Sequence, residues 1–548
     1  MPPDMSNPAV VSLRERKLDR SCLLILAAAT LLVYSVTLFN NFVLDDEVII
    51  VNNPKTFSLR NLHETLLSPD LVKPYYRPLN RATYLLDYRV AGVHPAWYHG
   101  VNIAIHLGTV FLLYLMIRRL LPDRGAALVA ALVFGVHPVN SEAVNFISAR
   151  NTLLALFFSL ASLVAFLDAR ERGKRLPLLS ALLFFCGLLS KETAFMLIIV
   201  VVLYTSYPLT GREERKTWRG RLLFLFPYLF LAMVYFAMRF FSLQGVVGTA
   251  IPAEGLFHRL AQNYHIIPQY LGLLLFPADL TIFHNVPQGG WFDPPWFFPV
   301  WIVLLAAAGL VLRSRNRVAC FAMAWFVINY FPISNIVPIP SEPVAERYLY
   351  MPSIGFFIAL GMLFSRIPAQ GRIRQALWGG VAIIVIAYAA LTIQRNLDWK
   401  DNLSLFFSGV MKDPSSAAAH YNLGTAYMEK EDLASARREW ESTLAIAPGY
   451  ADALTQMGTL AAVQGDLPTA ERYYLAALQA PPGVSDPDKS MAHYNLGKIY
   501  EIHRQTERAL QHYRRFLENV PITYLEYRPD AERRIARLRA ASTSEPAR

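Results

Sequence analysis

A series of about eleven long apolar runs is the feature that most limits how this 548-residue chain can fold. Many windows of about 17–20 residues are almost wholly apolar, which is long enough to cross the hydrocarbon core of a bilayer. Only 17% of the residues are charged, against roughly 25% in soluble domains. The runs lie near residues 21–40, 101–117, 126–141, 151–168, 176–190, 193–209, 222–241, 295–312, 318–331, 351–365 and 375–394. We therefore expect an all-α fold that begins with a polytopic bundle of membrane helices.

The connections between these runs alternate in character. Short basic connections, such as Arg118–Arg124 and Arg366–Arg374, alternate with longer ones rich in acidic, proline and aromatic residues, such as 41–100, 242–294 and 332–350. Because basic loops stay in the cytoplasm, the first set and the N-terminus are expected there. An odd number of spans then places everything after residue 395 on the non-cytoplasmic side. Losing one of the two weakest predicted spans, 126–141 or 176–190, would reverse the C-terminal half.

Net charge and cysteine content exclude two other classes of protein. The formal charge is +11, but the basic residues form short clusters between apolar runs. That pattern indicates membrane topology rather than nucleic-acid binding. The cysteines are Cys22, Cys186 and Cys320, which form no disulfide framework and no zinc motif. The basic tail of residues 1–20 precedes a long apolar run without a convincing cleavage site, as in an uncleaved signal anchor.

A period of about 34 residues begins near Ala417. Each unit carries a glycine, several aromatic residues and a closing proline at matching positions, which is the tetratricopeptide pattern of paired helices. The expected organisation is a tail (1–20), a membrane domain (21–395) with an outer loop (41–100), a linker (396–416), three repeats (417–523), and a capping helix with a tail (524–548). Such a solenoid offers a groove for an extended peptide, although it could also serve as a spacer or a self-association module.

Three consecutive acids, Asp45, Asp46 and Glu47, follow the first apolar run. If that run spans a membrane, these carboxylates emerge on the side opposite the N-terminus. Close like charges raise a proton affinity, and a carboxylate with a raised pKa can act as a base. The alternative is a solvated turn, since acids just outside a span are common.

Other polar segments are predicted to lie on the same side as Asp45. Ionisable groups at membrane depth are costly and usually face a functional cavity. Each could also be a local cap, an ion pair or a side chain that reaches the headgroups. Together they predict one polar site with a base and several cations able to bind phosphate. The candidates are Asp45 and Asp46 for catalysis, and Arg77, His137, Glu142, Arg150, Lys191, Glu346 and Arg347 for binding the donor phosphate or substrate.

Six motifs in order resemble the transmembrane and tetratricopeptide repeat-containing O-mannosyltransferases, which have the C-type glycosyltransferase fold. The motifs are FVLDDEVIIVNNP (42–54), YYRPL (75–79), HPVNSEAVNFISARNTLL (137–154), LLSKE (188–192), SNIVPIPSEPVAERYLYMPSIGF (334–356) and RNLDW (395–399). The resemblance covers nearly the whole chain. It is specific for the superfamily and less so for the sugar.

The resemblance implies transfer of a sugar, with mannose expected, from a polyprenyl-phosphate carrier to a hydroxyl of a protein acceptor. It implies an inverting mechanism with Asp45, or its neighbour Asp46, as the base, and Arg347 first among the cations for the leaving phosphate. The implied partners are membrane lipid, the lipid-linked sugar and a peptide in the repeat groove, without nucleic acid. No metal-ligand cluster is evident, although Asp45 and Asp46 could bind a divalent cation.

Compact loops and few cysteines would suit a bacterial inner-membrane enzyme with its repeats outside; a eukaryotic member would lie in the endoplasmic reticulum membrane. Two other functions remain open. An O-antigen ligase or polymerase would centre its chemistry on arginines and a histidine in a late outer loop. A membrane-anchored repeat scaffold would need no polar site. A transporter fits less well, because charges are scarce in the middle of the runs.

Overall fold

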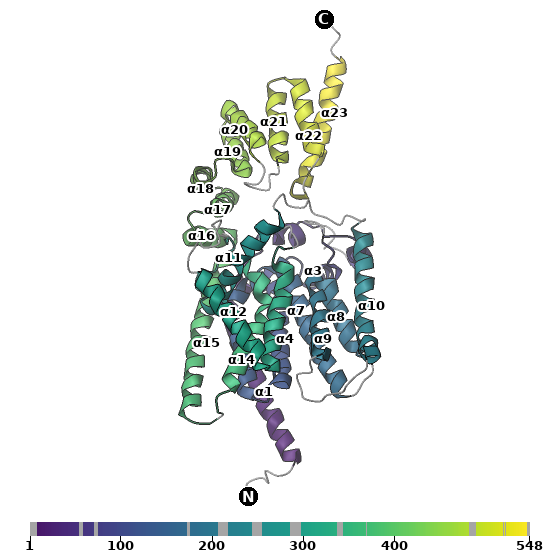
Figure 1. The fold of residues 1–548 in the computed structure, drawn as a ribbon. Helices are drawn as coiled ribbons and strands as arrows, with labels where there is room; N and C mark the ends of the chain where they lie inside the picture. The colour runs from purple at the N-terminus through teal and green to yellow at the C-terminus, as the bar shows by residue number, and fades with distance from the viewer. Residues whose placement is uncertain are drawn as a thin grey trace. The chain divides into compact units, whose positions relative to one another are not determined.

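The computed structural model describes residues 8–53, 59–70, 75–172, 176–206, 218–243, 255–284, 297–336, 344–368, 370–481, 489–518, 520 and 522–544. All regular structure in these residues is helical (Figure 1). The chain divides into two compact units, Met1–Asp401 and Asn402–Arg548. The all-α fold class predicted from the sequence is therefore confirmed.

The first unit is the apolar part of the chain. Its helices are α1 (Pro8–Tyr34), α2 (Leu62–Leu67), α3 (Pro78–Ala91), α4 (Pro95–Leu120), α5 (Arg124–Gly135), α6 (Ser141–Asn145), α7 (Arg150–Glu171), α8 (Leu178–Ser190), α9 (Leu197–Ser206), α10 (Trp218–Ser242), α11 (Leu256–Leu275), α12 (Phe297–Ser314), α13 (Arg317–Tyr330), α14 (Ser353–Ser365) and α15 (Arg372–Asp398). Short helical turns connect several of them: η1 (Ser35–Phe39), η2 (Glu47–Val51), η4 (Leu59–Asn61), η5 (Pro138–Asn140), η6 (Ile147–Ala149), η7 (Glu192–Met196), η8 (Phe331–Ile333) and η9 (Glu346–Tyr350).

The apolar runs predicted from the sequence fall on these helices, with 126–141 on the bent pair of α5 and α6, while residues 207–209 and 295–296 of two runs lie outside the described residues. Among the described residues, five helices are long and apolar enough to cross a membrane, and a bent pair, 124–135 with 138–145, could be a sixth span. The other predicted runs fall on shorter apolar helices of 10–17 residues. The unit is that of a membrane protein, and the number of eleven spans stays a prediction.

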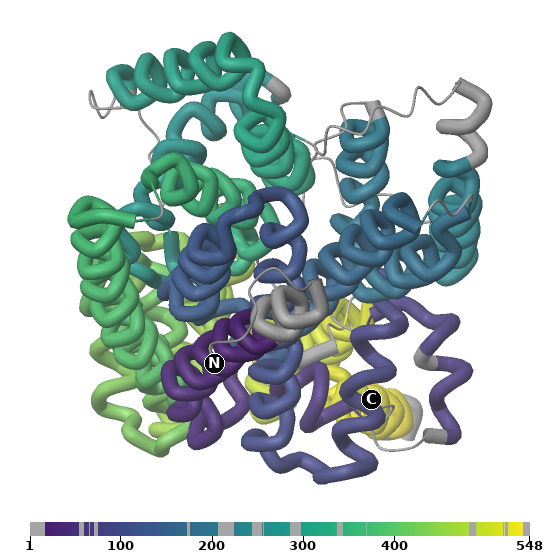
Figure 2. Tube along the Cα trace, turned by 90° about the horizontal axis from the view of Figure 1, so that it is seen from below, coloured from purple at the N-terminus to yellow at the C-terminus, as the bar shows by residue number. Residues whose placement is uncertain are grey.

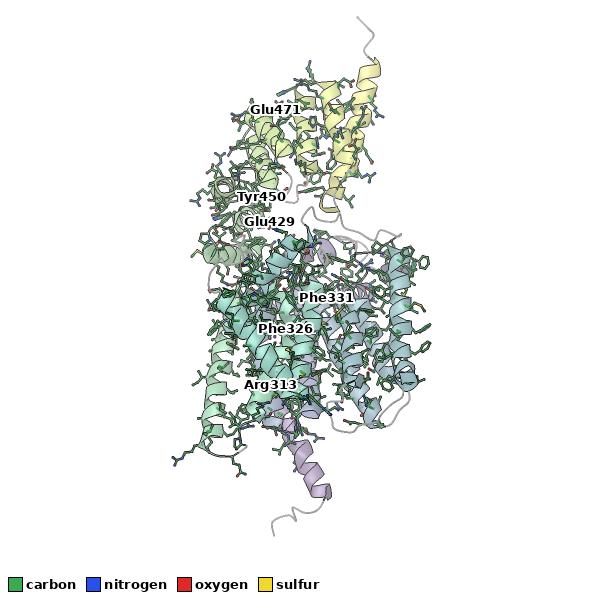
Figure 3. The ribbon with its side chains drawn as sticks, in the orientation of Figure 1. Arg313, Phe326, Phe331, Glu429, Tyr450 and Glu471 are labelled. Carbon is green, nitrogen blue, oxygen red and sulfur yellow. The ribbon has the colours of Figure 1, made fainter. Side chains whose placement is uncertain are left out.

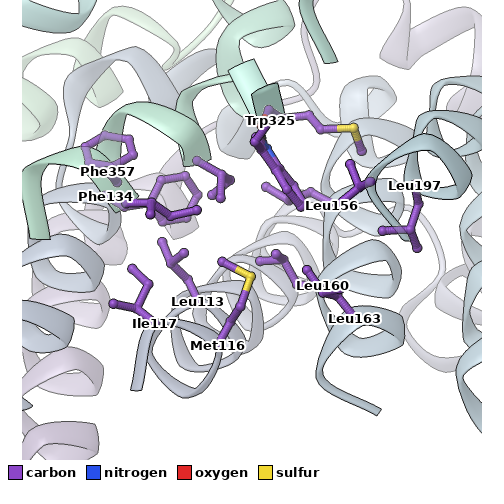
Figure 4. Close-up of a cluster of buried hydrophobic side chains, with 14 of the residues drawn as sticks. Leu113, Met116, Ile117, Phe134, Leu156, Leu160, Leu163, Leu197, Trp325 and Phe357 are labelled. Atoms are coloured by element: carbon purple, nitrogen blue, oxygen red, sulfur yellow. Dashed lines mark hydrogen bonds between the residues drawn. The ribbon is translucent and has the colours of Figure 1, made fainter. Parts of the chain in front are cut away.

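The core of the first unit lies between α4, α5, α7 and α14. Leu113, Met116, Phe134 and Leu156 are all fully buried there, and Trp325 of α13 closes one side (Figure 4). Figure 2, a view from below, shows α1 packed beside α4 and α5. These helices bury apolar side chains on several faces, as expected for the centre of a membrane bundle.

Close approach of helices in this core depends on a small residue. A Cβ atom at Gly355 of α14 would collide with the Ala322 carbonyl of α13. The Trp325 indole also donates to the Met351 carbonyl at 2.9 Å, which fixes α13 against the start of α14. Small residues at contacts and interhelical hydrogen bonds are the usual means of holding membrane helices together.

Polar contacts of this unit lie at both ends of α15. At one end, Arg124 donates to Asp19 at 2.8 Å and Arg374 donates to Asp123 at 2.5 Å. At the other end of α15, the Asn396 side chain donates to the carbonyl of Val33, near the end of α1, at 3.0 Å. Charged groups at the two ends with an apolar core between them are the arrangement that a bilayer requires.

The two ends of the bundle can also be followed along α12 and α13. Arg313, near the end of α12, and Phe331, just after α13, lie at different levels along the bundle, with Phe326 between them (Figure 3). The candidate site lies in the polar group that contains the end of α15. The ends of α1 and α15 therefore bring the acidic loop and the last motif of the unit to one place.

Two segments differ from the expectation. Residues 242–294 were expected to be an outer loop, but they include α11, whose Ile266, Tyr270 and Leu274 are buried against Val139 and Leu349. Residues 396–416 were expected to be a linker, but α15 extends to Asp398 and α16 (Asn402–Lys412) packs against the first repeat. The helix α11 has 20 residues but its apolar residues are interrupted by polar ones, α16 has only 11 residues, and tertiary packing stabilises both.

The second unit is a stack of helical hairpins. Its helices after α16 are α17 (Ala417–Glu429), α18 (Leu433–Ile446), α19 (Ala451–Val463), α20 (Leu467–Gln479), α21 (Ser490–Ile502), α22 (Thr506–Glu518), the short η10 (Ile522–Tyr527) and α23 (Arg528–Ser544). A Cβ atom at Gly424, Gly458 or Gly497 would lie 2.5–2.7 Å from Trp440, Tyr474 or Tyr513 respectively. The glycines thus admit the aromatic rings of the paired helix, as the sequence predicted.

The Arg-rich helix α23 ends the stack as expected for a cap. Tyr494 of α21 donates to Asp530 at 2.7 Å, and Arg534 donates to Glu501 at 2.9 Å. In the same hairpin Tyr500 donates to Glu471 of the preceding repeat at 2.8 Å. Ion pairs and tyrosine bonds therefore hold the last helix to the last repeat, while its other arginines face solvent.

Candidate functional site

The two acids that follow the first apolar helix occupy different environments. Asp46 is fully buried, whereas Asp45 is exposed. One Asp46 carboxylate oxygen accepts the Ser148 amide at 2.7 Å and the Ser148 hydroxyl at 2.5 Å. The other oxygen accepts the Val43 amide at 3.3 Å. Asp46 therefore attaches the acidic loop to η6, and Asp45 is the exposed acid of the two.

The backbone around Asp45 departs from regular geometry. Leu44 has a φ of +54°, a conformation that costs energy for a residue with a branched side chain. The next residues form η2, a single turn of π-helix, which is a rare geometry that occurs mostly at functional sites. Unfavourable backbone geometry on both sides of Asp45 is consistent with a loop shaped for function.

Burial raises the pKa of Asp46 to about 7. The bonds from Ser148 and Val43 lower that pKa, and the charge of Asp45 raises it with the smallest effect. The expected rise in proton affinity is present, but its main cause is desolvation rather than repulsion between the neighbouring acids.

A buried network of three asparagine side chains joins the acidic loop to two other motifs. Asn40 donates to Asn145 at 3.0 Å and to the Asn396 carbonyl at 2.9 Å, and Asn145 donates to the Asn396 side chain at 2.6 Å. Trp399 stacks on Phe146, with ring centroids 6.0 Å apart. The RNLDW motif therefore supports the site through hydrogen bonds and packing.

Arg347 lies at the same end of the bundle and pairs with Glu142. Its backbone amide donates to Glu142 at 2.9 Å, and its guanidinium makes a salt bridge to the same carboxylate. The side chain retains 22% exposure, and the guanidinium lies over the rings of Phe146 and Tyr348, 5.8 and 5.1 Å from their centroids. Arg347 is therefore oriented by an acid and two rings and still open to solvent.

Lys191 and Arg77 form the second group of cations. Arg77 makes two parallel hydrogen bonds to Glu192, at 2.9 and 3.2 Å, which is the bidentate geometry typical of arginine. Lys191, in the extended break between α8 and η7, donates to Thr152 of α7 at 2.8 Å. The sequence left open a pair between Lys191 and Glu192, but Glu192 instead binds Arg77.

These contacts bring Asp45, Asp46, Arg347 and Lys191 into one region. The ring of Tyr348 lies 5.1 Å from the Arg347 guanidinium carbon and 5.9 Å from the Lys191 ammonium. Phe146, under Arg347, is two residues before Ser148, which binds Asp46. Two residues span about 7 Å at most, so Asp46 and Arg347 border the same short segment.

Three predicted site residues have other roles in the structure. Arg150 is fully buried and donates to Asn102, Thr83, Asp87 and the Tyr98 carbonyl. A guanidinium with so many internal partners is a structural group of the bundle.

His137 and Glu346 are also fully buried. His137 accepts the Val139 amide at 3.2 Å and contacts the Leu274 carbonyl at 3.1 Å, so it caps the turn in the bent pair of helices. Glu346 lies between His284 at 3.3 Å and Arg395 at 3.4 Å. The sequence could not separate these residues from Arg347, because it does not show which way a side chain points.

Several residues of the site were not predicted. Ser148 and Tyr348 lie within quoted motifs but carry no charge, so the search for ionisable groups passed over them. Asn40, Asn145 and Asn396 are far apart in the sequence, and only the fold shows that they meet. No group of three or more His, Cys, Asp or Glu side chains in the described part of the chain could hold a metal ion.

The fold and the site define a class: a membrane bundle of helices with a polar site at one end, followed by tetratricopeptide repeats. Comparison with protein families agrees. Residues 89–239 match the family model of dolichyl-phosphate-mannose-protein mannosyltransferase, and residues 407–451 and 455–521 match that of the tetratricopeptide repeat.

The relatives are named protein O-mannosyl-transferases. The chain is 27% identical to the Caenorhabditis elegans protein O-mannosyl-transferase F38B6.6, over 78% of this chain and 63% of that protein. It is 27% identical to human protein O-mannosyl-transferase TMTC1, over 79% and 56%, and 24% identical to mouse TMTC3, over 75% and 50%. The resemblance predicted from the motifs is confirmed, and the matched part spans about half to three-fifths of each relative.

Proposed function

We propose that this chain is an integral membrane glycosyltransferase that transfers mannose from a polyprenyl-phosphate carrier to a hydroxyl of a protein acceptor. The exposed Asp45, on the loop that the buried Asp46 attaches to the segment on which Arg347 packs, carries this proposal. The names of the family model and of the relatives support the sugar and the class of acceptor.

In the proposed reaction Asp45 takes the proton from the acceptor hydroxyl. The acceptor oxygen then forms a bond to the anomeric carbon, on the face opposite the phosphate, and the bond between that carbon and the phosphate oxygen breaks. The products are the glycosylated acceptor with inverted configuration, a protonated Asp45 and a lipid phosphate with one additional negative charge. A positioned base accelerates such a step by about 10²–10⁴-fold.

The lipid phosphate gains charge as it leaves, so it needs nearby cations. Arg347 is the arginine best suited to this task among those predicted, because it is partly exposed and oriented by Glu142. Arg77 is less open, with 12% exposure, and is held bidentately by Glu192. Arg150 and His137 are assigned to the fold rather than to the phosphate.

The repeats are proposed to present the acceptor. Lys400, at the end of the first unit, accepts the Asn41 amide at 2.8 Å, so the chain continues into the second unit from the end of the bundle that carries the site. A membrane protein exposes that end on one side only. We therefore place the repeats on the same side as the site, which by the distribution of basic loops is non-cytoplasmic.

Sugar transfer by the full chain tests this function. Purified protein in lipid nanodiscs would be incubated with radiolabelled polyprenyl-phosphate mannose and an acceptor lysate, with GDP-mannose as the control donor. We expect label in protein from the lipid donor and none from the nucleotide donor. Incorporation into polysaccharide would favour the ligase alternative. Folded protein that transfers no sugar from any common lipid carrier would favour the scaffold and overturn the proposal.

A further inference from the structure

Lys191 differs from the two arginines around it in its ionic partners. Arg77 is paired with Glu192 and Arg347 with Glu142, both by salt bridges. The polar contact of the Lys191 ammonium is with the neutral hydroxyl of Thr152 at 2.8 Å, and the ring of Tyr348 lies 5.9 Å away. Of these three cations, Lys191 is thus the one that lacks a carboxylate within salt-bridge distance among the described residues.

The other charged groups that face Lys191, two arginines and two glutamates, have a net charge of zero. Arg77, next to α3, and Arg347, on η9, are positive; Glu192, on η7, and Glu142, on α6, are negative. Asp70 and Arg239 act in turn on the pair of Arg77 and Glu192. A protonated Lys191 adds one uncompensated positive charge to a half-buried place, which is unfavourable unless an anion arrives.

From this arrangement we infer that Lys191 is the phosphate anchor of the site and that it takes up one proton when the lipid phosphate binds. The inference rests on the proposed function and deepens it. A polyprenyl-phosphate sugar is a phosphodiester with one negative charge, so one proton on Lys191 neutralises it. The proton comes from solvent, and the ammonium then remains to stabilise the second charge that the phosphate acquires when the sugar leaves.

The local electrostatics agree with this assignment. Burial, together with the charges of Arg77 and Arg347, lowers the pKa of Lys191 to about 7, while Glu192 and Glu142 raise it by less. A bound anion favours the charged form and therefore raises that pKa again. Between the pKa of Lys191 in the free protein and its raised pKa in the donor complex, donor affinity depends on proton concentration. Donor binding should therefore weaken by about tenfold for each unit of pH increase above 7.

Binding of polyprenyl-phosphate mannose to the full chain in nanodiscs tests the inference. This diester does not itself titrate between pH 7.5 and 9, and at pH 8, above the pKa of about 7, most Asp46 carboxyls have lost their proton. Calorimetric titrations at pH 8, in buffers with different ionisation enthalpies, count the protons taken up. We expect about one proton per lipid in the wild type and a Kd that rises about tenfold per pH unit.

Two variants separate charge from structure. Lys191→Arg keeps a permanent cation, so its affinity should not depend on pH and it should take up no proton. Lys191→Met should bind at least tenfold more weakly at pH 7.5, again without pH dependence. Lys430→Met removes an exposed lysine of the second unit and should behave as the wild type does.

The wild-type titration decides the inference even if a variant fails to fold. Binding by the wild type that is independent of pH and takes up no proton would overturn it. Sugar transfer measured on the same preparation would then show whether the proposed function still holds. A wild type that binds and transfers no lipid-linked sugar would overturn both.

Discussion

Ser148 donates both its backbone amide and its hydroxyl to one oxygen of Asp46, at 2.7 and 2.5 Å. The two residues lie 102 positions apart in the sequence, and their contact joins the acidic loop to the segment on which Arg347 packs. The buried acid therefore supports the loop, and the acid beside it, Asp45, is exposed.

Removing the Ser148 hydroxyl should loosen this support. Ser148→Ala leaves Asp46 with the two backbone amide donors, Ser148 and Val43, so we expect the first unit to lose about 1–3 kcal/mol of stability. Sugar transfer should fall more than donor binding, because Asp45 is displaced while the cations stay in place. Ser148→Thr, which keeps the hydroxyl, should restore transfer. Equal losses in donor affinity and turnover would contradict a role in positioning Asp45.

The buried Asp46 should make stability depend on pH. The unfolded carboxyl loses its proton near pH 4, whereas the folded one holds it to about 7. The folded state thus binds more protons over this window, and stability should fall as pH rises from about 4 to 7, by up to about 4 kcal/mol. Thermal unfolding in nanodiscs checks this. Asp46→Asn, which resembles the protonated form, should lose the dependence; an unchanged slope would contradict the assignment.

Arg347 should be required for the transition state more than for folding. Arg347→Ala should reduce kcat/KM by about 10²–10³-fold, the usual loss when a donor to a developing charge is removed. Arg347→Lys should restore little, because lysine cannot reproduce the planar contact with Glu142 and the rings. Arg313→Lys, at the end of α12, serves as the control. Full activity in Arg347→Ala would contradict the assignment.

The asparagine network should matter for stability. Asn396→Ala removes the acceptor of the buried Asn145 side chain and the donor to the Val33 carbonyl, while the Asn396 carbonyl that Asn40 binds stays in place. We expect a loss of about 1–3 kcal/mol for each group left unsatisfied, seen as a lower unfolding temperature. Asn422→Ala changes a half-buried residue of the first repeat. It should lower the stability of the first unit much less than Asn396→Ala does. A smaller effect from Asn396 than from Asn422 would contradict the role of the network.

Local sequence patterns predicted the helices and the class of protein. Apolar runs mark the membrane helices, and the glycines that receive Trp440 and Tyr513 mark the repeats. The sequence also placed Asp45, Lys191 and Arg347 at one end of the bundle, because charged residues interrupt apolar runs at few places.

Contacts between distant residues could not be predicted in the same way. Arg150 and Arg347 look alike as charges beside a span, but one points into the bundle and the other toward solvent. The role of Asp46 depends on Ser148, and that of Asn396 on Asn40, neither of which leaves a local signal. The helix α11 was missed because polar residues interrupt its apolar ones, so it forms no long apolar run, although Ile266, Tyr270 and Leu274 pack against Leu349.

The identity of the base is the central claim, and sugar transfer by Asp45→Asn beside Asp46→Asn tests it most directly. Both proteins would be compared at equal amounts of folded material, with donor binding measured in parallel. We predict that Asp45→Asn binds the lipid donor as the wild type does and loses at least 10²-fold in turnover, while Asp46→Asn retains measurable transfer. Normal turnover in Asp45→Asn, with transfer abolished in a folded Asp46→Asn, would contradict the account.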